Sequence, residues 1–307
     1  MSDSLEKFRP RSLDDIVGQS ESVAILKRLV AKAKDGGFFP NLLFAGSPGT
    51  GKTTASLAIA NELLGDYASE NFREINSSDE RGIDVVRDDI AKWVTNMHSR
   101  EVPFRVLALE ECDGLTPDAQ AGLRRIMESA TETRFIMTCN KPAKVIDAIR
   151  SRCLTLNFKP LTNADLTGLL TRVAASEGVP VEQTRLQSAI KHSRGDARRA
   201  IHLFVDGQTD GDRFLRLDLA IETMLRGQGG PLARVESFVG FLRQEGFDGE
   251  WESVCEAIGD RVYEDKLYSD PVKANWIDGL AVAAYRAAQA QLPLFQIRGV
   301  LHALMNQ

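Results

Sequence analysis

A phosphate-binding loop is the feature that most constrains this chain. Residues 46–53 read GSPGTGKT, which fits the pattern GxxxxGK[ST], between an apolar run at 41–45 and a helical pattern at 52–64. Glycines let backbone N–H groups converge on phosphate oxygens, and the following helix N-terminus favours a bound anion. Lys52 supplies a mobile charge, and the Thr53 hydroxyl can ligate Mg²⁺. The residues expected to bind a nucleoside triphosphate are Pro48, Gly49, Thr50, Gly51, Lys52, Thr53 and Thr54.

The surrounding pattern predicts a parallel sheet. From residue 40 to 160, short apolar runs alternate with amphipathic stretches, which is typical of βαβ units. Strands are expected at 41–45, 72–75, 105–109, 134–139 and 154–158, with helices near 52–64, 83–98, 117–129 and 145–150. Because the strand runs are uniformly apolar, helices should cover both faces of the sheet.

After residue 160, every periodic segment has helical spacing. A small helical unit is followed near 206–213 by a segment rich in Gly and Asp, which is typical of a linker. Four or five further helices are expected beyond it. The predicted domains are therefore an α/β domain at 1–160, a small helical domain at 161–212 and an all-α domain at 213–307.

Composition limits the partners that overall charge could attract. The 307 residues carry 38 Lys and Arg against 43 Asp and Glu, a net charge of −5, so binding to DNA would need a local arrangement of charge. The four cysteines are scattered without a CxxC pair, which predicts reduced thiols rather than a disulfide framework or a zinc ribbon.

No apolar run approaches the ~18 residues of a membrane span, and neither export nor membrane insertion is expected.

Polar residues follow two of the predicted strands. Glu110 and Glu111 end the third apolar run, at the sheet edge where an open α/β sheet binds its ligand. They could serve as a magnesium-holding carboxylate and a water-activating carboxylate; the alternative is a solvated acidic turn. Asn140 follows the fourth strand and could position the attacking water, although an Asn in this place can also be an ordinary turn residue.

Together these motifs resemble the AAA+ clamp-loader ATPases, most closely the replication factor C small subunits. The resemblance is carried by EKFRPRSLDDIVGQ at 6–19, GSPGTGKTT at 46–54, INSSDERGIDVVR at 75–87, DAQAGLRRIME at 118–128, CN at 139–140, SRC at 151–153 and GDARRAIH at 195–202. It covers residues 5–205, and the remainder matches only in length and helical content. It implies an α/β P-loop AAA+ module with a parallel five-stranded sheet, a small helical lid domain and an all-α collar domain for oligomerisation.

The same resemblance implies roles for residues outside the phosphate loop. The nucleotide would be ATP with Mg²⁺. Arg152 would be an arginine finger that acts on ATP bound to the neighbouring subunit, and Arg198 would be the lid sensor that touches the γ-phosphate in its own subunit. Ile16 and Val17 would line the adenine pocket. Without the motifs around them, the arginines would be surface ion-pair partners and the apolar residues part of the core.

One departure from the family concerns the acidic segment. The family normally shows Asp-Glu-Ala-Asp, whereas this chain has Glu110, Glu111, Cys112 and Asp113. The catalytic Glu is retained as Glu111. Glu110 carries one methylene more than Asp, in a site where magnesium geometry is tight. Either hydrolysis is slowed or the backbone accommodates the longer side chain.

The family also implies surfaces for DNA and for a sliding clamp. DNA would lie inside a spiral of five modules and touch helices 82–98 and 117–129 through its backbone, without sequence specificity. The candidate DNA contacts are Ser77, Ser78, Arg81, Arg87 and Arg124. The alternative for Arg87 and Arg124 is pairing with Asp88 or Glu128 on a solvated face. The apolar stripe Trp93, Val94 and Met97 would either meet the clamp or pack on the module's own sheet.

The implied function is an ATP-dependent loader that places a sliding clamp on primer-template DNA, in a pentamer with other loader subunits and without a membrane partner. One alternative is a structural subunit of the same complex that binds ATP without hydrolysing it. Another is a different AAA+ DNA motor, such as a branch-migration helicase. The cysteine-rich zinc module of bacterial loader subunits is missing, which points to an archaeal, eukaryotic or viral lineage. The scattered, reduced cysteines predict a cytoplasmic location, or a nuclear one in a eukaryote.

Overall fold

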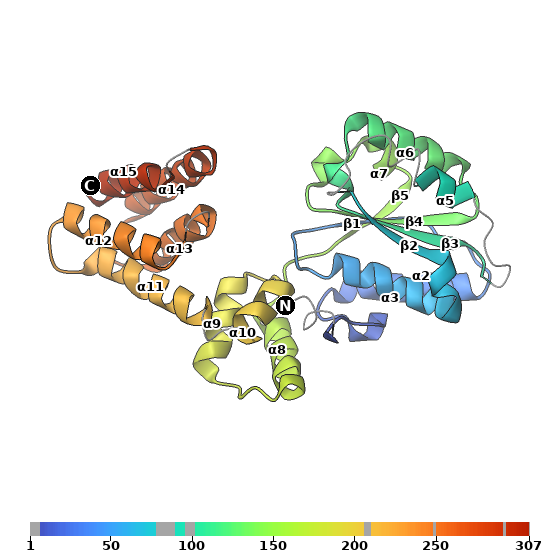
Figure 1. Ribbon diagram of the computed structural model, residues 1–307, viewed down its shortest axis with the longest axis horizontal. Coiled ribbons are helices and arrows are strands. Elements are labelled where there is room, and N and C mark those ends of the chain that lie inside the picture. Colours follow the sequence, from blue (N-terminus) through green and yellow to red (C-terminus); the bar gives the residue numbers. More distant parts are fainter. Residues whose placement is uncertain are drawn as a thin grey trace. The chain divides into compact units, whose positions relative to one another are not determined.

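The computed structural model describes residues 7–77, 90–95, 102–205, 210–247, 250–290 and 293–306. The chain divides into two compact units, residues 1–205 and residues 206–307. The first unit contains a sheet with helices on both faces and a group of three helices that follows it, and the second unit is entirely helical (Figure 1).

The first unit is built on a five-stranded parallel sheet. The strands are β1 (Asn41–Ala45), β2 (Phe72–Asn76), β3 (Arg105–Glu110), β4 (Thr133–Cys139) and β5 (Cys153–Asn157), in the order β2-β3-β4-β1-β5. Neighbouring strands are all parallel, and Ala45 lies opposite both Cys139 of β4 and Asn157 of β5. The five predicted strands are confirmed, with ends that differ by at most one residue. Their carboxyl ends meet at one edge of the sheet, where the phosphate loop follows β1.

Alternation along the strands divides the core into two layers. Leu42 and Phe44 of β1 belong to one buried cluster with α2 (Ser20–Lys34) and α3 (Lys52–Leu64). Leu43 of the same strand belongs to the other cluster, with α6 (Pro117–Ser129). Figure 1 shows α2 and α3 on one face of the sheet and α6 on the other. The expectation of a sheet covered on both faces is therefore confirmed for the central strands β1, β3 and β4, which are buried along most of their length, whereas the edge strands β2 and β5 are largely not buried.

Local signals set the helix boundaries around the sheet. Thr116 caps α6 by accepting a hydrogen bond from the Ala119 N–H at 3.3 Å, and Pro117 occupies the first turn, where no intrahelical donor is needed. The remaining elements at the sheet are η1 (Leu13–Asp15), η2 (Gly65–Tyr67), α4 (Ala68–Asn71), α5 (Ala91–Thr95), η4 (Cys112–Gly114), η5 (Pro142–Lys144) and α7 (Asp147–Arg150). The helix predicted over 83–98 lies largely outside the described residues, and α5 is the part of it that the structure describes.

Three helices complete the first unit: α8 (Asn163–Glu177), α9 (Gln183–Ser193) and α10 (Ala197–Val205). A capping box begins α8, because the Thr162 hydroxyl accepts from the Asp165 N–H and the Asp165 carboxylate accepts from the Thr162 N–H. Gly178, in the left-handed conformation at φ +65°, ends it. These helices form the group that the sequence analysis called the lid.

The second unit contains α11 (Asp210–Arg226), α12 (Pro231–Gln244), α13 (Trp251–Glu264), α14 (Asp270–Gln289) and α15 (Pro293–Met305). Its buried core includes Phe238, Phe247 and Trp276. The predicted fold class, an α/β module followed by helical parts, is confirmed, while the three-domain boundaries stay a prediction. Among the residues that the structure describes, no helix combines the length and apolar character that a membrane span requires.

Candidate nucleotide-binding site

The phosphate loop takes the conformation that its glycines permit. Gly49 and Gly51 have φ angles of +68° and +95°, in the region that favours glycine. A Cβ atom on Gly46 would lie 2.1 Å from the carbonyl oxygen of Phe158, the residue that follows β5. The loop therefore passes the end of β5 too closely for any side chain at position 46. The first turn of α3 follows at Lys52. The loop therefore presents glycine N–H groups and a helix N-terminus to the same point, as an anion site requires.

Lys52 is buried at the centre of this loop, with 7% of its surface exposed. Its Nζ donates to the carbonyl oxygens of Gly46 and Ser47, each at 2.8 Å, and to Asn140 Oδ1 at 2.9 Å. Burial lowers the pKa of Lys52, whereas the charge of Glu110 raises it in part. The ammonium group is thus held in place by the loop and by the end of β4, where it can face phosphate oxygens.

Thr53 and Glu110 form the part of the site that could hold a metal ion. Thr53 Oγ1 donates to Glu110 Oε2 at 2.5 Å, and Thr138 Oγ1 donates to the same oxygen at 2.9 Å. The second carboxylate oxygen, Oε1, is buried without a hydrogen-bond partner. Burial raises the pKa of the Glu110 carboxyl, while the hydrogen bonds from Thr53 and Thr138 lower it.

These donors fit Mg²⁺, which prefers hard oxygen ligands. A hydroxyl and a carboxylate lie side by side, and an unpartnered buried oxygen is available for a ligand. The part of the chain that the structure describes contains no cluster of three His, Cys, Asp or Glu residues that could hold a metal alone. A magnesium site here would take its other ligands from phosphate oxygens and water, as is usual for this ion.

Glu111 lies at a strained turn directly after β3. Its φ and ψ of 54° and 42° are left-handed, which is uncommon for a residue other than glycine. The Glu111 N–H donates to Thr138 Oγ1 at 3.1 Å, and the Glu111 side chain is exposed. The turn separates the two carboxylates by environment, because Glu110 is buried beside Thr53 whereas Glu111 remains accessible to water.

Asp113 fixes the position of Asn140, a function that the sequence analysis did not assign. Its two carboxylate oxygens accept from the N–H groups of Asn140, at 3.3 Å, and Lys141, at 2.9 Å. Asn140 in turn accepts from Lys52. The distance of 27 residues between Asp113 and Asn140 hides this bond from local patterns, although the acidic segment itself was visible. We call Lys52, Thr53, Glu110, Asp113 and Asn140 the phosphate-loop edge.

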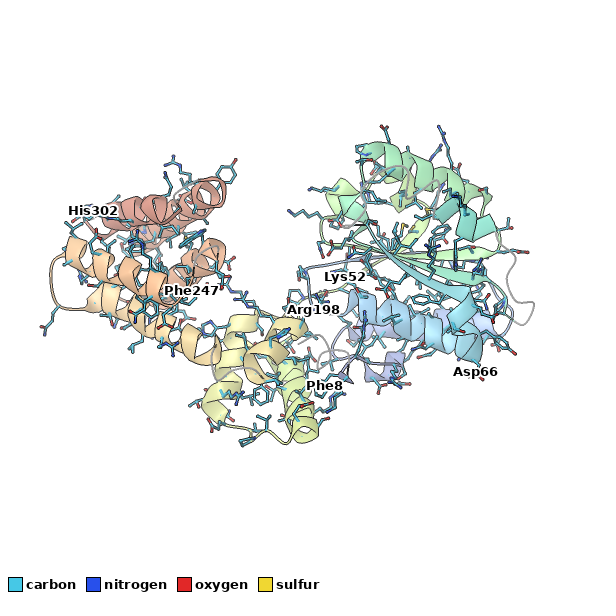
Figure 2. The ribbon with its side chains drawn as sticks, in the orientation of Figure 1. Phe8, Lys52, Asp66, Arg198, Phe247 and His302 are labelled. Carbon is cyan, nitrogen blue, oxygen red and sulfur yellow. The ribbon has the colours of Figure 1, made fainter. Side chains whose placement is uncertain are left out.

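A cavity of about 190 Å³ adjoins this edge. Ile16 and Val17 line it, and so do residues 49–54 of the loop, while Pro48 is not among its lining residues. Arg198 of α10, labelled in Figure 2, also lines this cavity, and so does Ile201 of the same helix. The structure therefore brings the predicted adenine-pocket residues, the loop and the predicted lid sensor to one cavity.

The lid reaches the phosphate loop directly. The Ala197 N–H donates to the Gly49 carbonyl oxygen at 2.9 Å. The Asp196 carboxylate lies so close to Gly49 that a Cβ there would be 1.8 Å from Oδ1. Asp196 also caps α10 by accepting from the Arg199 N–H at 2.9 Å. Gly49 thus serves two needs, the loop conformation and the close approach of the lid.

Gln19 joins three segments that are distant in sequence. Its Nε2 donates to the carbonyl oxygens of Lys159, at 2.6 Å, and Thr50, at 3.3 Å, and its Oε1 accepts from the Lys159 N–H at 3.0 Å. Gln19 itself is left-handed, at φ 56°. One amide thereby links the N-terminal segment, the phosphate loop and the connection from β5 to the lid. In the sequence, Gln19 was visible only as the last residue of the motif at 6–19.

Arg152, the predicted arginine finger, lies away from the cavity of its own chain. Its guanidinium donates to Glu128 Oε1 at 2.5 Å and to the Ala148 carbonyl oxygen at 2.8 Å, and 38% of its side chain is exposed. The lining of the 190 Å³ cavity does not include it. Its action on a neighbouring subunit stays a prediction.

The candidate DNA contacts differ in placement. Ser77 is fully buried, and its N–H donates to the Glu110 carbonyl oxygen at 3.0 Å, so its hydroxyl has no surface that could touch phosphate. Arg124 is partly exposed and pairs with Glu128 at 3.4 Å, which is the pairing that the sequence analysis held open. Ser78, Arg81 and Arg87 lie outside the described residues.

The apolar stripe proposed for the clamp is partly committed to the protein's own core. Trp93 and Val94 pack against the buried cluster on the α6 face of the sheet. The Arg105 guanidinium lies 3.7 Å from the centre of the Trp93 ring and donates to the Trp93 carbonyl oxygen at 2.6 Å. For these two residues, the structure favours packing on the sheet over a free surface. Met97 lies outside the described residues.

Comparisons with known proteins agree with this geometry. The family model described as "ATPase family associated with various cellular activities (AAA)" matches residues 42–161. The replication factor C small subunit of Sulfurisphaera tokodaii is 37% identical over 312 residues, which cover 97% of this chain and 94% of that protein. The replication factor C small subunit of Methanococcus vannielii is 44% identical over 204 residues, which cover 66% of this chain and 64% of that protein.

A solved structure supports the fold alone. The Thermotoga maritima RuvB Holliday junction branch migration motor superposes with a TM-score of 0.56, covering 95% of this chain and 91% of that chain. Sequence identity between the two is 20%. This likeness shows a shared arrangement of elements and carries no argument about substrate.

Proposed function

Because this chain belongs to the replication factor C small-subunit family, we propose that it is an ATP-hydrolysing subunit of a complex that loads sliding clamps onto primer-template DNA. One observation carries the proposal. At one sheet edge Lys52 donates to Asn140 and Thr53 donates to Glu110. Glu111 follows Glu110 at a left-handed turn. This set contains each part that phosphoryl transfer to water needs from one protein chain.

Within a single chain, the phosphate-loop edge would bind the nucleotide and orient the attacking water. Lys52 would exchange carbonyl partners for phosphate oxygens, and the loop N–H groups would hold the same anion. Thr53 and Glu110 would hold Mg²⁺, which would neutralise charge on the phosphates. The Asn140 amide would orient the attacking water, and Glu111 would accept its proton. Arg198 lines the same cavity and would contact the γ-phosphate.

The reaction would be completed at a seam between two subunits. We propose that Arg152 leaves Glu128 and reaches the triphosphate of a neighbour, where a guanidinium offsets charge that develops on the transferred phosphoryl group. Arg124 would contact the DNA backbone from α6, and the second unit would hold the subunits together as a pentameric collar. Hydrolysis would then depend on the assembly, whereas nucleotide binding would not.

The test compares Glu111→Gln with the parent in the assembled loader, supplied with clamp and primed DNA. We expect nucleotide affinity to stay within about twofold and turnover to fall by about 10² or more, because the proton acceptor is lost. Glu21→Gln is the matched control, since the Glu21 side chain is 87% exposed at the start of α2. Equal ATPase rates in parent and Glu111→Gln would contradict the assignment.

The second candidate is a subunit that binds ATP without hydrolysing it. It is favoured by Glu110, whose longer side chain already reaches Thr53 and whose pKa is raised by burial. The same ATPase assay separates the two candidate functions. If this subunit does not hydrolyse ATP, the assembly that contains the parent chain should turn over ATP no faster than an assembly that lacks this chain. Restored hydrolysis in Glu110→Asp would identify the extra methylene as the cause.

A further inference from the structure

A second cavity lies between the N-terminal segment and α8. It has a volume of about 320 Å³. Among the residues that the structure describes, its lining includes four cationic side chains, Lys7, Arg9, Arg11 and Arg172, and one acidic side chain, Asp15. The chain as a whole has a net charge of −5, so this concentration of positive charge runs against the composition. We call this site the N-terminal basic cavity.

Partners within the protein offset part of this charge. Lys7 Nζ pairs with Glu177 Oε1 at 2.8 Å. The Asp15 carboxylate accepts from the Ser12 hydroxyl at 2.7 Å. Among the residues that the structure describes, neither Arg11 nor Arg172 makes an ion pair. The cations of this cavity that the proposal below uses are therefore the guanidinium groups of Arg11 and Arg172.

The N-terminal basic cavity shares a wall with the nucleotide cavity. Phe8, Arg9, Pro10 and Leu169 line both. Leu169 is buried in α8, and Arg172 follows it by three residues on the same helix, so the two cavities meet across one turn. Figure 2 labels Phe8, which belongs to this shared wall. A ligand that joined Arg11 to Arg172 would therefore also fix residues that enclose the nucleotide.

We propose that the N-terminal basic cavity binds a small multivalent phosphate anion, for which inorganic pyrophosphate is the probe. Guanidinium groups from two separate segments suit phosphate oxygens, because each can donate two parallel hydrogen bonds. A cavity of about 320 Å³ accepts such an ion but does not admit a nucleic-acid duplex. The bound anion holds the N-terminal segment against α8 and slows the release of nucleotide from the adjoining cavity.

The binding test uses the full chain with its nucleotide site saturated by ADP, so that the phosphate loop is filled. Pyrophosphate is titrated by calorimetry at low ionic strength, where exposed charges are least screened. We expect one saturable site whose affinity falls at least tenfold in Arg172→Glu and less in Arg172→Gln. Arg28→Glu, a change at an exposed arginine of α2, is the control and should stay within twofold.

Four results would overturn the binding proposal. The first is absence of saturable binding while ADP fills the phosphate loop. The second is equal affinity of Arg172→Glu and the parent for pyrophosphate, and the third is equal affinity of the parent for sulfate and pyrophosphate. The fourth is displacement of pyrophosphate by a short single-stranded oligonucleotide, which would assign the cavity to a nucleic-acid backbone.

The coupling test follows release of a pre-bound fluorescent ADP into excess unlabelled nucleotide. Pyrophosphate should slow the release about threefold in the parent and have no effect in Arg172→Glu, because a ligand that stabilises one wall acts on both sites. An unchanged release rate despite bound pyrophosphate would overturn the coupling. Neither test contains a clamp or primed DNA, so failure here is distinguishable from failure of the proposed loader function.

Discussion

The phosphate-loop edge and the surface of Arg124, Glu128 and Arg152, here called the arginine surface, hold their charges in different ways. At the edge, Lys52 is buried and all three of its protons have acceptors within the chain. On the arginine surface, both guanidinium groups share one exposed carboxylate oxygen, Glu128 Oε1. At the edge, the chain itself satisfies the hydrogen bonds of the charged group. On the arginine surface, the guanidinium groups can exchange Glu128 for another anion.

This difference separates binding from turnover. A buried charge without its hydrogen bonds is costly, so the edge must be preorganised before nucleotide arrives. An exposed ion pair contributes only ~0–1 kcal/mol, so Arg152 can leave Glu128 at little cost when a stronger anion is offered. We therefore expect nucleotide binding to be a property of one chain and hydrolysis a property of neighbouring chains.

The largest effect should come from Arg152→Ala in the assembled complex. Turnover should fall by about 10³ or more, because a guanidinium supplied in trans stabilises charge on the transferred group. Steady-state ATPase measurement with clamp and primed DNA checks this, beside nucleotide affinity of the isolated chain, which should not change. Arg150→Ala, an exposed arginine of α7 that pairs with Asp147, is the control. Unchanged turnover in Arg152→Ala would remove the distinction between the two regions.

The next effect concerns the edge alone. Lys52→Ala should weaken nucleotide binding by the isolated chain about 10²-fold, because hydrogen bonds to charged groups contribute about 1.5–3 kcal/mol each. Calorimetric titration gives the affinity, and circular dichroism checks that the fold is retained. Lys159→Ala removes a lysine whose side chain is 77% exposed and should bind as the parent does. Equal affinity in Lys52→Ala would show that the loop N–H groups suffice.

Asp113→Ala should have a smaller effect, because Asp113 acts on Asn140 by positioning it. Loss of its two backbone hydrogen bonds should lower turnover about tenfold and leave the KM for ATP nearly unchanged. Asp113→Asn, which retains one acceptor oxygen, should recover part of the loss. The exposed Asp118 of α6 offers the control Asp118→Asn. A raised KM with unchanged kcat would instead mean that Asp113 supports nucleotide binding.

Local signals in the sequence predicted the fold and the phosphate-loop edge except for the role of Asp113. The apolar runs of β1 and β3 indicated buried parallel strands, and the loop motif indicated Lys52 and Thr53 without reference to distant residues. The positions of Glu110 and Asn140 followed from one rule, that the carboxyl ends of parallel strands meet.

The contacts that local patterns did not show are those made through space. Gln19 binds Lys159 across 140 residues, and Asp196 approaches Gly49 from the lid. Trp93 illustrates an ambiguity of another kind, because an apolar helical stripe fits a core or a partner equally well. The packing of Trp93 against the cluster on the α6 face and the Arg105 guanidinium on its ring favour the core.

Glu128→Gln should produce the smallest effect and is the most discriminating test of the comparison. It removes the charge that Arg124 and Arg152 share, yet exposed pairs contribute so little that stability should change by less than ~1 kcal/mol in thermal unfolding. Glu128 could simply pair with Arg152 whenever Arg152 is not in contact with the triphosphate of a neighbouring subunit. In that case, freeing the guanidinium should leave the turnover of the assembly unchanged or raise it by up to about twofold. A tenfold loss would show that Glu128 positions Arg152 for the neighbouring site, and the arginine surface would then be as preorganised as the phosphate-loop edge.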